Sequence, residues 1–419
     1  MRRGLVPFLL GALACGRPAP IEDLVVRLAV VAPIGDVSPE AHSGAAPFAA
    51  DLVFEPLLRP EAGGATSRLL RRWERAGPRR WSLMVAEGLR FSDGSLVESE
   101  DVARALREQG LEARSAGAGA VEVAWRPGAP PVDIALHWAQ VARRTARGWL
   151  GTGSFAVESQ SDTKLVLRRV AAVPGRIASV ELIAFPSSRD AFARLLRGEA
   201  NALVNIDRAQ AELLEGVPSL QLVRGMAPNA LVVLFGKLAP EDRRALAAAL
   251  PVGEIGAAAL GRECAGDPAA PAGAVPPGRQ LRVGYGRYLP EFPRAALALR
   301  RALGERGGDI VSLAPADFTA RAADLDLSVT TQLVRPRGVA AMYYASGAVW
   351  NWSRYSNAAY DAALAAGDEE AASAALAALP PGVVLCRRER IAAVDARLKN
   401  VSLGAWGLLD TLPEWEVAP

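Results

Sequence analysis

The segment Arg90–Val102 constrains the fold most, because it joins a tight turn to the start of a helix. Phe91 and Leu96 flank the turn Ser-Asp-Gly, and Asp-Gly between apolar residues is typical of a hairpin, since glycine accepts the positive φ that the turn requires. Ser99 is the expected N-cap of the helix, and the two acidic residues after it suit the positive end of the helix dipole. Apolar residues then follow at helical spacing until Gly110, so the segment predicts a turn that leads into a capped helix.

The size and composition of the chain favour a folded protein with more than one domain. Its 419 residues suggest two or three domains. Apolar residues make up 51% of the chain, which is enough for a large core and argues against disorder. The formal net charge is only +3, and no basic patch with interleaved aromatic residues occurs, so we expect no nucleic-acid partner.

Strand and helix patterns alternate along the chain. Leu24–Val31 is an apolar, β-branched run that predicts a buried strand, and Leu231–Phe235 predicts a central strand. Leu281–Tyr285, Arg294–Arg306 and Asp309–Leu313 follow one another as strand, helix and strand, and a Gly-Gly pair ends the helix. This order indicates a right-handed unit with parallel strands, so the sequence predicts an α/β protein.

The first fifteen residues, Met1–Cys15, have the pattern of an export signal. Two arginines precede the apolar run Leu5–Leu13, which is too short to span a bilayer. The sequence Ala-Leu-Ala-Cys ending at Cys15 resembles a bacterial lipobox, whose cysteine is lipidated, although Ala12 stands where such signals prefer leucine. An ordinary signal peptide cleaved nearby is the alternative, and both interpretations predict an exported protein.

Two further cysteines, Cys264 and Cys386, leave two possibilities open. An oxidising compartment permits a disulfide between them. Cys386 follows the apolar residues 383–385, however, and could instead be a small buried side chain without a partner.

Three segments resemble the family 5 extracellular solute-binding proteins, the peptide- and nickel-type receptors of ABC importers. Trp81–Val102 is similar to the family's tryptophan, "kF-x-DG" turn and "t-A-e-D-V" helix start, with serine at Ser92 and Ser99 where the family has other residues. Gly151–Phe155 is similar to its "GTGPY" turn, and Asn351–Asp361 resembles its "N-x-s-x-y-s-n-p-x-x-D-x-l" segment. These segments lie in the family's order along the chain.

The resemblance implies an α/β, two-lobe periplasmic-binding-protein-like fold with mixed sheets and a hinge between the lobes. It implies a lipoprotein signal peptide at 1–15, a first lobe of 16–229 and 400–419 with an inserted subdomain at about 46–148, and a second lobe of 230–399. The implied function is that of a receptor lipoprotein that delivers a small or peptide-like ligand to the permease subunits of an ABC importer. We expect a monomer in the periplasm, held to a membrane by the lipid on Cys15.

The residues that enzymes use for catalysis are scarce. His42 and His137 are the only histidines, and they show no metal-ligand spacing. There is no Gly-x-Ser-x-Gly elbow and no pairing of cysteine with histidine. We therefore expect no enzymatic activity, no metal and no cofactor.

Aromatic residues near position 350 suit the walls of a ligand site. Peptide-binding members of the family carry a "D-x-x-x-x-G-W-x-x-D" segment whose last Asp pairs with the peptide's amino terminus. Aligning its first Asp on Asp326 places Gln332 at the Trp and Arg335 at the last Asp. The predicted ligand-binding residues are Gln332, Arg335, Tyr343, Trp350 and Trp352.

Arg335 would disfavour an ammonium group and suit a carboxylate or phosphate, so the sequence predicts an anionic or neutral ligand rather than a free-amine peptide. The alternative is that Arg335 is a solvated loop residue beside Arg337, and that some of the aromatic residues belong to the core. A second function stays open, that of a family relative that has lost transport and acts as a sensory or scaffolding lipoprotein. Permease and ATPase genes beside this one would favour import.

Overall fold

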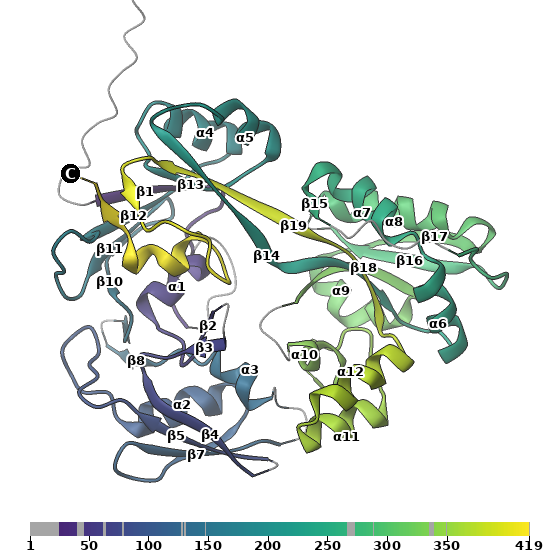
Figure 1. The fold of residues 1–419 in the computed structure, drawn as a ribbon, viewed down its shortest axis with the longest axis horizontal. Coiled ribbons are helices and arrows are strands. Elements are labelled where there is room, and N and C mark those ends of the chain that lie inside the picture. The colour runs from purple at the N-terminus through teal and green to yellow at the C-terminus, as the bar shows by residue number, and fades with distance from the viewer. Residues whose placement is uncertain are drawn as a thin grey trace, which may run out of the picture.

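The computed structural model describes residues 25–39, 46–61, 64–77, 79–126, 129, 131–146, 148–265, 273–287, 289–334, 339–348 and 350–418. The predicted signal peptide with Cys15 and the predicted ligand-binding residue Arg335 lie outside these residues. The described chain forms two α/β lobes, left and right in Figure 1, which are joined by long strands. The predicted α/β class is confirmed.

The first lobe is built on a sheet with the strand order β10–β11–β12–β1–β13. Central β1 (Val25–Val30) pairs in parallel with the strands on both sides, and its Val26 and Leu28 are fully buried, as the apolar run predicted. The other elements of this lobe are β10 (Phe155–Gln160), β11 (Lys164–Arg169), β12 (Ser179–Ala184), β13 (Ala202–Ile206), α1 (Ala46–Val53), α4 (Ser188–Leu196) and α5 (Arg208–Leu214).

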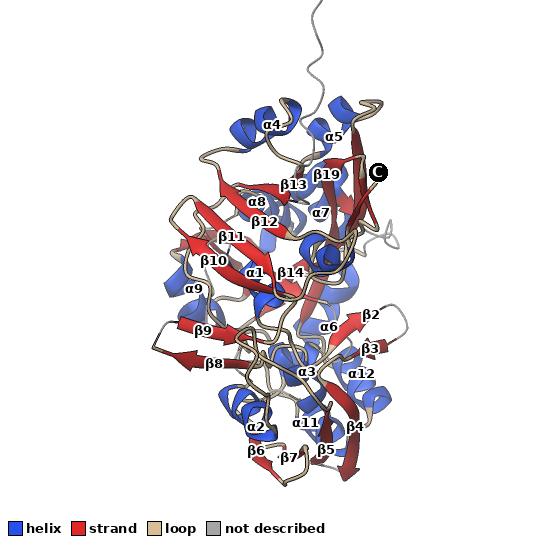
Figure 2. Ribbon diagram, turned by 90° about the vertical axis from the view of Figure 1, so that its left-hand side faces the viewer, coloured by secondary structure: helices blue, strands red, loops and turns tan. Residues whose placement is uncertain are grey.

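A smaller sheet, ordered β4–β5–β7–β6, lies at the opposite end of the first lobe from α4 and α5 (Figure 2). It has a core of its own, in which Phe91, Val102 and Leu106 are buried. This sheet, the helices α2 and α3 and the two-stranded pairs β2–β3 and β8–β9 form the small-sheet subdomain. The bounds are β2 (Arg59–Glu61), β3 (Gly64–Thr66), β4 (Leu70–Gly77), β5 (Arg80–Val85), α2 (Ser99–Glu108), β6 (Glu112–Ser115), β7 (Ala120–Ala124), α3 (Val132–Leu136), β8 (Ala142–Thr145) and β9 (Gly148–Gly151).

Helix α2 follows the turn as predicted, but its cap differs by one residue. The N-cap is Glu98, and Ser99 is the first helical residue, with its hydroxyl 2.6 Å from that of Ser115. The Asp101 carboxylate accepts from the backbone N–H of Glu98 at 3.0 Å and also pairs with Arg143 at 2.6 Å. Asp101 can satisfy the helix start from inside the first turn, so the preceding residue needs no capping side chain.

The second lobe contains the predicted strand–helix–strand unit. β16 (Leu281–Gly286) pairs in parallel with β17 (Gly307–Leu313), and α8 (Glu291–Ala302) connects them. The helix ends earlier than predicted, because Gly304 adopts a positive φ of 58° and the next turn is a 3₁₀ helix. The other elements are α6 (Pro240–Ala249), α7 (Val252–Leu260), α9 (Pro315–Arg321), β18 (Leu327–Leu333), α10 (Ala340–Tyr344), α11 (Ala358–Ala366) and α12 (Glu369–Ala378).

Two long strands, β14 (Leu220–Phe235) and β19 (Gly382–Asp395), run through both lobes (Figure 1). They pair with each other over most of their length, but the register shifts between Met226 and Ala230 and again between Leu231 and Val232. Pro228 lies in the first of these intervals and has no N–H to contribute to a ladder. The irregular stretch marks the place at which the paired strands can bend most easily.

The C-terminal segment packs on the first lobe. Leu412 and Trp415 are fully buried in the same core as Val26 and Leu28. Ala392 and Val394 of β19 also belong to this first-lobe core, although the sequence predicted 230–399 as the second lobe. The elements of this segment are β20 (Leu398–Lys399), the 3₁₀ helix η5 (Leu408–Glu414) and β21 (Glu416–Val417).

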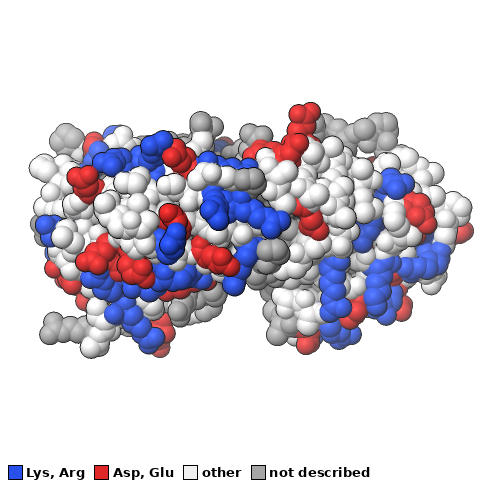
Figure 3. Space-filling model, turned by 90° about the horizontal axis from the view of Figure 1, so that it is seen from below, with Lys and Arg blue, Asp and Glu red and all other residues white. Residues whose placement is uncertain are grey.

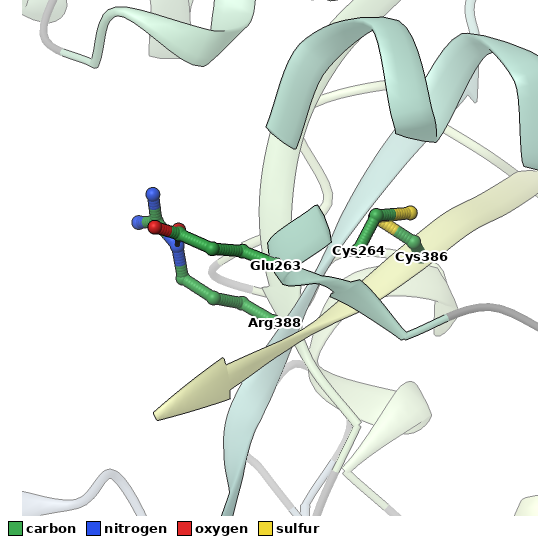
Figure 4. The surroundings of a disulfide bond; sticks show 4 residues. All are labelled: Glu263, Cys264, Cys386 and Arg388. Atoms are coloured by element: carbon green, nitrogen blue, oxygen red, sulfur yellow. Dashed lines mark hydrogen bonds and ion pairs between the residues drawn. A yellow bond between two sulfur atoms is a disulfide. The ribbon is translucent and has the colours of Figure 1, made fainter. Parts of the chain in front are cut away.

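Of the two possibilities left open for the cysteines, the structure has the disulfide. Cys264, on the short strand β15 (Cys264–Ala265), is bonded to Cys386 on β19 (Figure 4). Close to it, Arg388 pairs with Glu263 at 3.0 Å. Among the described residues, no single helix is long and apolar enough to cross a membrane. The bent helix pair α6–α7 has the length and composition of a broken span, but its Leu246 and Ile255 are buried in the second-lobe core.

Candidate functional site

Three tryptophans from three separate segments meet beneath the crossing strands. Trp138 follows α3 in the small-sheet subdomain, Trp350 follows α10 in the second lobe, and Trp406 precedes η5 in the C-terminal segment. The ring centroids of Trp138 and Trp350 lie 5.2 Å apart, and those of Trp138 and Trp406 lie 6.3 Å apart. These separations are those of touching rings, worth about 0.5–1.5 kcal/mol for each pair. The Trp138–Trp350 pair is a direct contact between the lobes, whereas the Trp138–Trp406 pair lies within the first lobe.

Apolar residues extend this contact on both sides. Ile134 of α3 packs with Met342 and Tyr343 of α10, and Trp138 and Trp350 cover the same cluster. The lobes therefore meet through an apolar, aromatic surface at the base of the space between them. Such a surface suits the wall of a ligand cleft, because aromatic side chains stack on planar or apolar groups.

A charged pair holds Trp406 in place. Arg390 of β19 donates from Nη1 to the backbone oxygen of Trp406 at 2.6 Å, and Asp410 accepts from the Trp406 N–H at 2.6 Å and from the Gly407 N–H at 3.3 Å. Burial lowers the pKa of Arg390 and raises the pKa of Asp410. Both the backbone N–H and the backbone oxygen of Trp406 are therefore hydrogen-bonded to a charged side chain.

Beside these two residues lies a cavity of about 80 Å³, in which the polar side chains of Asp51, Asn205, Arg390 and Asp410 lie among apolar residues. Burial raises the pKa of Asp51 from its ordinary 3.8 to about 6, against the lowering effect of a 2.6 Å hydrogen bond from Gln140. The negative charge of Asp410 raises the pKa further. A cavity of this size has room for ordered water near its polar groups rather than for a ligand.

Gln332 lies on β18, is 4% exposed and faces the aromatic residues of α10. Its Oε1 accepts a hydrogen bond from the Tyr344 hydroxyl, whereas its buried Nε2 has no hydrogen-bond partner among the described residues. A buried donor without a partner costs about 1–3 kcal/mol, so an acceptor supplied by a ligand would remove this cost.

The other predicted residues divide into two groups. Trp350 is in the tryptophan cluster, and Tyr343 is beside it at 5.3 Å, with its hydroxyl accepting from the Leu333 N–H at 2.9 Å. Trp352 packs edge-on against Phe318 at 6.1 Å and covers the second-lobe sheet. Packing within the second lobe therefore accounts for Trp352, while Trp350 and Tyr343 face the first lobe.

Several residues of this site were missed from the sequence. Trp138 lies in a stretch, 131–147, whose pattern was ambiguous, and Trp406 lies in a C-terminal tail without a recognised motif. Asp51 and Arg390 carry no local signal at all, because their role depends on a fold that brings residues more than 300 positions apart into one cavity. The concentration of aromatic residues near position 350, and the family alignment that selected Gln332, pointed to the site.

The described residues can also be searched for side chains that could bind a metal ion. There, no group of three or more His, Cys, Asp or Glu side chains is close enough together to hold a metal ion. The site as described is thus built from aromatic rings, one amide donor and a few buried charges.

No protein-family model matches the chain, and no curated protein sequence does. Solved structures do match over nearly its whole length. The oligopeptide-binding protein AppA from Bacillus subtilis, in complex with a nonapeptide, has 12% identity and a TM-score of 0.69, with 94% of this chain and 99% of that chain covered.

Two further solved structures have the same architecture. The ABC transporter substrate-binding protein CtaP from Listeria monocytogenes has 15% identity and a TM-score of 0.73 over 94% of this chain and 99% of its own. NikZ from Campylobacter jejuni, in complex with Ni(L-His), has 14% identity and a TM-score of 0.69 over the same shares. The resemblance seen in the sequence is confirmed at the level of the fold: this chain has the two-lobe fold of the peptide- and nickel-type substrate-binding proteins of ABC transporters.

Proposed function

We propose that this protein is the solute-binding receptor of an ABC importer and that it delivers a small or peptide-like ligand to a membrane permease. The observation that carries the proposal is the tryptophan cluster beneath the crossing strands, to which both lobes contribute, in a fold shared with peptide- and nickel-binding proteins. A receptor of this kind needs two walls that close on a ligand, and the cluster provides an aromatic surface on each.

We propose that the lobes move about the irregular stretch of β14 between Met226 and Ala230. The first lobe would consist of 16–229 with 400–419, including the subdomain at about 46–148, and the second of 230–399, with β19 running through both. Opening at this hinge would separate Trp138 from Trp350 and expose the cleft. Because the described apolar contact at this point is the small cluster around Ile134, Trp138 and Trp350, the open and closed forms would differ by only a few kcal/mol.

The ligand in this proposal lies against Gln332, Tyr343, Trp350 and Trp352, and the sequence adds Arg335 as a further proposed contact. The unpartnered Nε2 of Gln332 supports a ligand with an acceptor oxygen at this point. A carboxylate, a phosphate or a neutral amide would suit both this donor and the Arg335 guanidinium. The proposed ligand is accordingly anionic or neutral rather than a peptide with a free amino terminus.

The proposal includes a location and an anchor. Cys15 would carry a lipid and hold the mature protein as a monomer at the membrane, on the periplasmic side. The Cys264–Cys386 disulfide supports an oxidising compartment, because such bonds persist mainly outside the cytoplasm.

The second candidate, a transport-inactive relative with a sensory or scaffolding role, is favoured by one feature. The rings of Trp138 and Trp350 touch each other, so side chains of the protein itself form the contact between the lobes at this point. A receptor that closes fully on its own tryptophans would have little need of a solute.

Native mass spectrometry of the protein purified under gentle conditions tests the proposed function. A receptor should carry a small molecule at a 1:1 ratio, and the variant Gln332→Ala with Trp350→Ala should lose it. A matched variant, Leu213→Ala on the exposed face of α5, should keep it. If the wild type carries no ligand and binds none from a cell extract, the receptor function is wrong and the scaffolding alternative stands.

A further inference from the structure

A second space between the lobes lies away from the proposed cleft. It is a cavity of about 250 Å³ between the β4–β5–β7 sheet and helices α11 and α12. These elements form the lower ends of the two lobes in Figure 1, and Figure 3, seen from below, shows mixed positive and negative side chains on this face. Gln332, Tyr343, Trp350 and Trp352 do not line this cavity, so it is separate from the proposed ligand site.

Aromatic and apolar side chains from both lobes form its walls. Trp81 of β5 and Trp125, just after β7, come from the first lobe, while Tyr360 and Leu364 of α11 and Leu376 of α12 come from the second. A cavity of this size is below the usual range for drug-sized ligands and suits a molecule of one ring with a short side chain.

The two arginines of the cavity already have neighbours. The Arg79 guanidinium lies over the ring of Trp125 at 5.3 Å. Arg75 donates to the Gly77 oxygen at 3.2 Å, and its guanidinium lies so close to Gly367 that any side chain at that position would collide with it. Gly367 has φ 71° and ends α11, so Arg75 closes one end of the cavity by a contact between the lobes.

Asp133 is different, because no other described residue donates a hydrogen bond to its carboxylate or forms an ion pair with it. It lies in the first turn of α3 and lines the cavity. Burial raises the pKa of Asp133, as does the nearby charge of Glu369, while Arg75 and His137 act in the opposite direction. A half-buried carboxylate without an ion-pair partner is stabilised by a cation that binds beside it.

We propose that this cavity binds a small amine, with its ammonium group paired to Asp133 and its apolar body held among Trp81, Trp125 and Tyr360. Aromatic faces and a carboxylate together select a cation with an apolar body, since the ring faces attract positive charge. Each lobe supplies one wall, so an amine would bind only the arrangement in which the lobes touch and would stabilise it.

The test uses the full-length purified protein and three probes of the same shape: 2-phenylethylamine, 2-phenylethanol and 3-phenylpropionate. We expect calorimetry at neutral pH to show binding of the amine, and binding of the alcohol and the acid weaker by about tenfold or more. In Asp133→Asn, the amine should lose about tenfold in affinity while the alcohol is unchanged. No amine binding, or equal binding of all three probes, would overturn the proposal.

A second pair of variants keeps the test decisive if Asp133→Asn folds poorly. Ser373 and Ala374 are adjacent, exposed residues of α12, and only Ser373 lines the cavity. Ser373→Trp should fill the cavity and abolish amine binding, whereas Ala374→Trp should leave it intact. Amine binding that survives Ser373→Trp would place the probe elsewhere and refute the assignment.

Discussion

Asp51 offers a quantitative test of the cavity beside Arg390 and Asp410. Its carboxyl has a folded-state pKa of about 6, against an ordinary value of 3.8, chiefly because it is buried. A raised pKa means that the folded protein binds the proton more tightly than the unfolded chain. The resulting stabilisation is complete below the unfolded value and is lost as the pH rises through about 6.

The full shift of about 2 pKa units corresponds to about 3 kcal/mol between low and high pH. Between pH 7.5 and pH 5, only part of this is expressed, and we expect the wild type to gain about 1.4 kcal/mol in unfolding free energy relative to Asp51→Asn. Asn cannot ionise, and its Oδ1 can still accept the hydrogen bond from Gln140, so the variant should be the more stable protein at pH 7.5.

Urea unfolding of both proteins, followed by tryptophan fluorescence at a series of pH values, measures this difference. Asp93→Asn is a suitable comparison, because hydrogen bonds from Ser95 hold the pKa of exposed Asp93 below its ordinary value and the pH dependence should have the opposite sign. If the free-energy difference between wild type and Asp51→Asn stays constant from pH 5 to pH 7.5, the buried-carboxylate account of this cavity is wrong.

Three further predictions follow from other parts of the molecule. Trp138→Ala removes the ring that contacts Trp350 across the lobes, so it should shift the lobes toward an open arrangement by about 0.5–1.5 kcal/mol, seen as a larger radius of gyration in small-angle scattering; an unchanged radius would contradict this. Removing the disulfide by Cys264→Ser with Cys386→Ser should lower the unfolding free energy by about 2–4 kcal/mol in urea, because the bond closes a loop between residues 122 positions apart; equal stability of the double variant and the oxidised wild type would count against it. The Arg335→Asp variant should gain affinity for di- to pentapeptides in calorimetry, and tight peptide binding by the wild type would remove the argument about ligand charge.

The parts of the fold that were predicted from the sequence are those with local signals. β1, the turn before α2 and the β16–α8–β17 unit each follow from hydrophobic spacing and from turn or cap residues within about 30 positions. β14 was only half recognised, as Leu231–Phe235, because its first half reads Leu-Gln-Leu-Val-Arg-Gly-Met and is stabilised by pairing with β19 more than 160 residues away. The N-cap of α2 was predicted at Ser99, because serine favours the N-cap position. The sequence does not show that the Asp101 carboxylate accepts from the backbone N–H of Glu98 one residue earlier.

The candidate site was harder to predict for the same reason. Trp350 and Tyr343 belong to a local run of aromatic residues, which is visible in the sequence. Trp138 and Trp406 become their neighbours only through the packing of α3 and of the C-terminal segment on the first lobe. A cleft between lobes is assembled from distant segments, so its composition depends on tertiary contacts that no local pattern specifies.

The central claim is that two lobes close on a solute, and a distance measured across the cleft tests it most directly. Spin labels at Glu87→Cys and Glu370→Cys, both exposed and on opposite lobes, report the separation by pulsed electron resonance. The protein as purified should show one short distance. After the protein is unfolded, washed free of ligand and refolded, a second population at longer distances should appear. Identical short distances in both samples, with no bound small molecule in either, would contradict the receptor function.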